Sequence, residues 1–104
     1  MALHHAKPAE PVHLASLDSQ HSTALVKTDQ FEAIHLVVRA GGSLAPHRVA
    51  GQFTLHCLTG RVTLSRTGAE SIGLDAGDWL YLGRAEEHGV EAQEDSTLLL
   101  TILF

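Results

Sequence analysis

Apolar and polar residues alternate with a period of two along most of this chain, which is the pattern of half-buried β-strands. The clearest alternation lies in residues 52–58, where Phe53, Leu55 and Cys57 are interleaved with polar neighbours. Turn-forming residues separate the alternating stretches, and no window shows helical spacing capped at both ends. The pattern predicts strands at 24–27, 31–39, 52–58, 61–65, 71–74, 78–82, 88–92 and 97–104.

Many short strands at regular intervals are typical of closed or double-sheet antiparallel folds. We therefore expect an all-β protein, a single antiparallel jelly roll or β-barrel. The 104 residues are enough for one domain with one hydrophobic core. We expect residues 23–104 to form the barrel domain and residues 1–22 to form a partly mobile N-terminal extension.

Composition and charge exclude several classes of partner. The formal net charge of −5, with scattered basic residues, argues against a nucleic-acid partner, and we expect none. The apolar stretch at 98–104 is far shorter than the roughly 20 residues that a membrane-spanning helix needs, so we expect no membrane partner. The first residues lack the pattern of a secretory signal. A single cysteine, Cys57, rules out an internal disulfide, and we expect a cytoplasmic location.

Two segments carry a recognisable spacing of glycines and histidines. They read GGSLAPHRVAGQFTLHCLTG, from Gly41 to Gly60, and GDWLYLGRAEEH, from Gly77 to His88. This spacing resembles the two short motifs of the cupin superfamily, with Gly41, His47, Gly60, Gly77 and His88 at motif positions. The chain is similar to small single-domain cupins of the RmlC-like, cupin-2 type. The resemblance covers about residues 23–104 and implies the cupin β-barrel.

The resemblance also carries an expectation about metal. A typical cupin site presents three imidazoles and one carboxylate from adjacent strands, a set that suits iron, manganese, nickel, copper or zinc. In this chain Val49 stands where the second histidine belongs, and Phe53 stands where the glutamate belongs. The resemblance therefore implies His47 and His88 alone as residual ligands of a divalent transition metal.

A shift of strand register would change that ligand set. A β-bulge near Ala50–Gly51 would turn Gln52 and His56 inward as further ligands. It would also turn the three apolar residues of the strand outward, and burying each large apolar side chain is worth about 1.5–3 kcal/mol. We therefore expect the apolar set to face inward and Gln52 and His56 to face outward.

The remaining candidate residues have ordinary structural interpretations. His35 alternates with inward-facing apolar residues, so we expect it outside, as a solvated, hydrogen-bonded or interface histidine, as we do His56. Cys57 is expected to be a buried thiol rather than a nucleophile. Trp79 and Tyr81 alternate with leucines, so one of the two sets lines the barrel. Residues 98–104 are apolar on both strand faces, which favours a homodimer.

Three classes of function remain open. The first is binding of a small, partly apolar molecule in the barrel. The second is a metal-dependent cupin enzyme, dioxygenase-like or isomerase-like, that uses His47 and His88 as ligands. The third is a structural or interaction barrel without a ligand. No substrate and no catalytic residue follow from the sequence. The residues expected to line the pocket are His47, Val49, Phe53, Leu55, Cys57 and His88.

Overall fold

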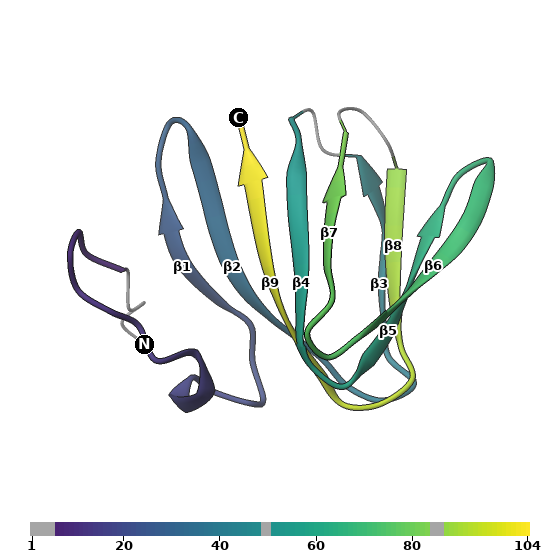
Figure 1. The fold of residues 1–104 in the computed structure, drawn as a ribbon, viewed down its shortest axis with the longest axis horizontal. Helices are drawn as coiled ribbons and strands as arrows, with labels where there is room; N and C mark the ends of the chain where they lie inside the picture. Colours follow the sequence, from purple (N-terminus) through teal and green to yellow (C-terminus); the bar gives the residue numbers. More distant parts are fainter. Residues whose placement is uncertain (1–5, 49–50, 84–86) are drawn as a thin grey trace.

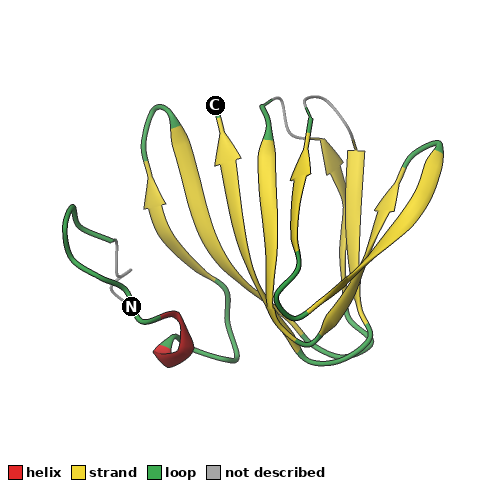
Figure 2. Ribbon diagram, viewed as in Figure 1, coloured by secondary structure: helices red, strands yellow, loops and turns green. Residues whose placement is uncertain are grey.

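The computed structural model describes residues 6–48, 51–83 and 87–104, and for residues 45–48 the backbone alone. This part of the chain holds a single short helix and nine strands (Figures 1 and 2). None of its helices is long and apolar enough to cross a membrane. The elements are η1 (Leu14–Ser16), β1 (Thr23–Lys27), β2 (Phe31–Val38), β3 (Ser43–Arg48), β4 (Phe53–Thr59), β5 (Arg61–Arg66), β6 (Ala69–Asp75), β7 (Trp79–Leu82), β8 (Glu87–Ala92) and β9 (Ser96–Leu103).

The strands form two antiparallel sheets that share one core. One sheet has the order β1-β2-β9-β4-β7 and the other has the order β3-β8-β5-β6. In Figure 1 the two sheets splay apart from a narrow base, where the turns between them gather. The expected all-β antiparallel jelly roll is confirmed.

The core is built by alternate residues of the central strands. In β4, Phe53, Leu55 and Cys57 are buried while their neighbours are less covered. In β9, Leu98 and Leu100 are buried in the same way, and β9 lies between β2 and β4. The apolar set of β4 therefore faces the core in the register that the alternation favours.

Strand β3 is absent from the sequence prediction. Its sequence, SLAPHR, lacks a clean alternation and contains Pro46, which removes a backbone donor. β3 lies at the edge of its sheet, and its pairing with β8 has an irregularity between Leu44 and His47. Edge strands and bulges are the places where a β-sheet accepts proline. The strand therefore forms from sheet geometry rather than from its own pattern.

The glycines of the two sequence segments form turns. Gly41, Gly60 and Gly77 all have positive φ, at 77°, 83° and 95°, a region that favours glycine. Gly60 also has a steric requirement, because a Cβ there would overlap Ser96. The buried Ser96 hydroxyl donates to the carbonyl oxygen of Glu94 at 2.7 Å and accepts from the Arg61 N–H at 3.1 Å. Each of these three glycines thus lies in a connection where the chain passes from one sheet to the other.

The chain before β1 lies against the five-stranded sheet. The Ala6 N–H donates to the carbonyl oxygen of Leu25, and the Val37 N–H donates to the Ser22 hydroxyl at 3.0 Å. Leu14 and Leu17 are half-buried. Residues 6–22 therefore cover part of the outer face of this sheet.

Candidate functional site

An apolar cavity lies between the two sheets. Its volume is about 210 Å³, which is below the roughly 300–1,000 Å³ of pockets for drug-sized ligands and leaves room for a very small molecule alone. Strands of both sheets contribute to its wall. The lining residues are Ile34 and Leu36 of β2, Leu44 of β3, Phe53 and Leu55 of β4, Leu64 of β5, His88 and Val90 of β8, and Leu100 and Ile102 of β9.

His88 is the one residue with a polar side chain among those lining residues. It lies near the start of β8 and is 3% exposed, and Val90 follows it on the same face of the strand. The ring of Phe53 meets the ring of His88 edge to face, with 4.9 Å between centroids and 81° between planes. This geometry is the favourable one for aromatic pairs. The imidazole is therefore held by packing at the cavity wall.

The backbone of His47 lies directly opposite His88 on the neighbouring strand. The register thus joins the two histidines of the sequence motifs across the pair β3–β8. The side chain of His47 and the whole of Val49 lie outside the described residues. Of these two expected pocket residues, the structure therefore places the backbone of His47 alone.

The described residues do not fit the metal centre that the resemblance implies. They contain no group of three or more histidine, cysteine or acidic side chains placed to hold a metal ion. Phe53 stands at the carboxylate position, and its ring packs on His88. An aromatic ring has no donor for a divalent cation. Among the described residues that line the cavity, His88 is therefore the one side chain with a donor for a divalent cation.

The register-shift alternative for Gln52 and His56 is wrong. Gln52 accepts a hydrogen bond from the exposed Tyr81 hydroxyl at 2.6 Å. His56 pairs with the exposed Trp79 across β4 and β7. Both residues therefore belong to the outer face. The apolar residues of β4 hold the inner positions because turning them outward would expose three buried side chains.

Cys57 differs from its expected place in the pocket. It is fully buried but is not among the residues that line the cavity. Its thiol contacts the carbonyl oxygen of Thr59, with 3.5 Å between sulfur and oxygen. Burial, and then the negative charges of Asp78 and Asp75, raise the pKa of this thiol. Cys57 is therefore a protonated core residue rather than a thiolate.

The structure also settles which residues of β7 face inward. Leu80 packs against the core and Leu82 is buried, whereas Trp79 and Tyr81 are 61% and 54% exposed. The aromatic pair therefore lies on the outer face.

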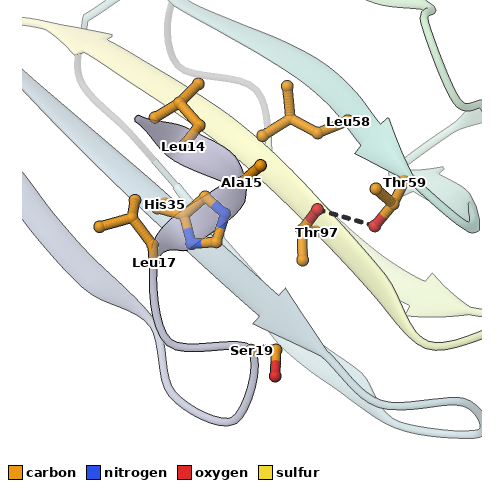
Figure 3. Close-up of a pocket in the computed structure, with 8 residues that line it drawn as sticks. All are labelled: Leu14, Ala15, Leu17, Ser19, His35, Leu58, Thr59 and Thr97. Atoms are coloured by element: carbon orange, nitrogen blue, oxygen red, sulfur yellow. Dashed lines mark hydrogen bonds between the residues drawn. The ribbon is translucent and has the colours of Figure 1, made fainter. Parts of the chain in front are cut away.

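His35 is the residue that sequence reasoning placed least well. It does lie on the outer face of β2, but it is 3% exposed rather than solvated. The segment containing η1 covers it (Figure 3). Burial lowers the pKa of His35. The apolar residues Leu14 and Leu17, in the segment interpreted as a mobile extension, were the one signal of this cover.

Several solved structures share this fold. A cupin superfamily protein from Desulfitobacterium hafniense has a TM-score of 0.83 and 16% identity, over 100% of this chain and 99% of that one. An RmlC-like cupin from Desulfovibrio desulfuricans has a TM-score of 0.72 and 24% identity, over 99% and 96%. KdgF from Halomonas has a TM-score of 0.69 and 20% identity, over 79% and 76%. No protein-family model and no curated protein matches the sequence. The chain therefore has the fold of small, single-domain RmlC-like cupins.

Proposed function

We propose that this protein binds a small, mostly apolar molecule in the barrel cavity, with His88 as the polar contact. The observation that carries the proposal is the composition of the wall, in which nine apolar residues surround one buried imidazole. Pockets of this kind bind through apolar contact and use a few polar groups for orientation. The occupant is therefore compact, largely apolar and equipped with one hydrogen-bonding group.

Phe53 favours binding of an apolar molecule over binding of a metal ion, because its ring lines the cavity and carries no metal ligand. Its ring occupies the space beside His88 and is itself 5% exposed. A ligand that enters the cavity thus meets an apolar floor and the imidazole of His88. Removal of apolar ligand surface from water supplies the main favourable term, about 25 cal/mol per Å².

A metal-dependent enzyme is the second candidate, and one observation favours it. The backbones of His47 and His88 are paired in the β3–β8 register, and two histidines on adjacent strands are half of a typical cupin ligand set. Neutral imidazoles without a carboxylate form an open site of low affinity for divalent ions. This candidate therefore requires ligands from outside the described residues.

The test uses the full chain purified without an affinity tag. Thermal unfolding is followed against a library of small aromatic and aliphatic compounds, each with and without EDTA. The variant Val90→Phe fills the barrel cavity from β8, and Glu91→Gln, at the exposed next position, is the matched control. Elemental analysis is done on the wild type and on the His47→Ala/His88→Ala variant.

Binding predicts that at least one compound raises the thermal midpoint with saturation, because a ligand specific for the folded state stabilises it. The shift is unchanged by EDTA, is retained in Glu91→Gln and is lost in Val90→Phe. Stoichiometric metal that disappears in the double histidine variant supports the enzyme instead. Neither metal nor any saturable shift supports a barrel that serves as structure alone.

A further inference from the structure

A second cavity lies on the outer face of the five-stranded sheet. It has a volume of about 430 Å³, within the range of small-molecule pockets. Strands β2, β4 and β9 form its floor, and the segment around η1 forms its roof (Figure 3). The lining residues are Leu14, Ala15, Leu17, Ser19, His35, Leu58, Thr59 and Thr97. None of these residues lines the barrel cavity, which lies on the other side of the sheet.

His35 places a buried imidazole at the floor of this cavity. The residue is 3% exposed. Its Nδ1 atom has no hydrogen-bond partner among the residues that the structure describes. An unsatisfied buried polar atom costs about 1–3 kcal/mol, and such an atom in a native fold calls for an explanation. In Figure 3 the imidazole lies between Leu17 and Thr97, at the cavity floor.

The rest of the wall selects a neutral partner for this atom. No Asp, Glu, Lys or Arg is among the lining residues. The hydroxyls of Thr59 and Thr97 hydrogen-bond to each other at 2.8 Å. The other lining residues are three leucines, Ala15 and Ser19, so a charged ligand would lose its hydration without gaining a counter-charge.

We propose that this outer cavity is a binding site for a neutral, mainly apolar molecule with one hydroxyl group, which hydrogen-bonds to Nδ1 of His35. A hydroxyl both donates and accepts. It therefore satisfies Nδ1 in either tautomer of the neutral imidazole. Nδ1 has almost no accessible surface in this structure, so the contact also requires a small rotation of the ring toward the cavity. The burial-lowered pKa of His35 is consistent with the neutral ring that this contact needs.

The roof gives the ligand a way in. The helix η1 contains no buried residue, and the Ser16 hydroxyl bonds within the same segment, to the His13 carbonyl oxygen. The Ser22 hydroxyl ties the end of the segment to β2 through the Val37 N–H. A segment with few buried contacts opens locally at low free energy. A ligand that packs under Leu14 and Leu17 stabilises the closed roof.

The experiment uses 4-methylphenol as the probe and toluene as its matched partner without a hydroxyl. Both are titrated into full-length, ¹⁵N-labelled protein while backbone amide and imidazole ¹⁵N shifts are recorded. Hydrogen exchange of the Leu17 amide, which donates to the Leu14 carbonyl oxygen, reports closure of the roof. The variants are His35→Leu, which removes the imidazole, and Leu58→Trp, which fills the cavity. Val90→Phe fills the barrel cavity and serves as the control.

We expect 4-methylphenol to bind with saturation, to shift Nδ1 of His35 and to slow exchange at Leu17. We expect it to bind at least about fivefold more tightly than toluene, the ratio for one hydrogen bond of about 1 kcal/mol. His35→Leu should bind both compounds equally, Leu58→Trp should bind neither, and Val90→Phe should bind as the wild type does. Equal affinities in the wild type, or saturable binding that leaves Nδ1 unshifted, overturn the proposal. The Nδ1 shift tests it even where a variant fails to fold.

Loss of 4-methylphenol binding in Val90→Phe would assign the binding to the barrel cavity and would also overturn this proposal. That result would leave the proposed barrel function standing. Conversely, binding at His35 with an inert barrel would refute the proposed barrel function alone. The two hypotheses are thus separable in one set of titrations.

Discussion

Replacement of Phe53 by alanine tests the packing on which the barrel cavity depends. Phe53 is 5% exposed in the core and meets His88 edge to face. Truncation of a buried phenylalanine costs about 3–5 kcal/mol, because the apolar transfer energy is lost and a void remains. The lost aromatic contact accounts for about 0.5–1.5 kcal/mol within that range. Set against a typical total stability of about 5–15 kcal/mol, the variant should still fold but be markedly weakened.

Urea unfolding followed by circular dichroism gives the magnitude. With a slope of about 1–3 kcal/mol per M, the unfolding midpoint of Phe53→Ala should fall by at least about 1 M. Thr54→Ala, at the next position on the outer face of β4, is the control and should change stability by less than about 0.5 kcal/mol. The enlarged apolar cavity should admit benzene, which would restore part of the stability. A loss below about 1 kcal/mol in Phe53→Ala would refute the inward packing and the cavity built on it.

Four further outcomes follow. Gly60→Ala should destabilise the protein more than Gly68→Ala. Both positions have positive φ, but a Cβ at Gly60 would also overlap Ser96 of β9, whereas a Cβ at Gly68 would meet nothing; equal losses in urea unfolding would contradict this. The pKa of His35 is lowered by burial, so the unfolded chain takes up the proton first. Stability should therefore fall as pH drops below about 6.5; His35→Leu should show a smaller fall between about pH 7 and pH 5, and parallel curves would count against it. Cys57 should react with a thiol reagent only after unfolding, and rapid native labelling would show that it is accessible. Sedimentation velocity should show a dimer, since the aromatic side chains of β7 are exposed; a stable monomer at micromolar concentration would exclude one.

The sequence predicts the fold well where the alternation of apolar residues is strong. Phe53, Leu55 and Cys57 have the same period and the same face in the pattern and in the structure. The pattern does not predict β3, because Pro46 and the irregular pairing beside it leave no regular alternation to read. That strand depends on its neighbour β8 at a sheet edge, which is information that a local window lacks.

The sequence predicts the position of His88 better than the surroundings of His35. The motif spacing places His88 in the barrel, and the structure finds it there among apolar residues. Alternation gives the correct side of β2 for His35 but the wrong exposure. Cover over an outward-facing residue depends on where a distant segment packs, and Leu14 and Leu17 are remote from His35 in sequence. Periodicity reports the face of a strand, not what lies above that face.

Strand β2 shows why one sheet can border two separate cavities. Ile34 and Leu36 line the barrel cavity, and His35 between them lines the outer one. A histidine between two inward-facing apolar residues leaves the barrel wall intact, because successive side chains of a strand point to opposite faces. The apolar requirement of the barrel therefore places no constraint on the chemistry of the outer cavity.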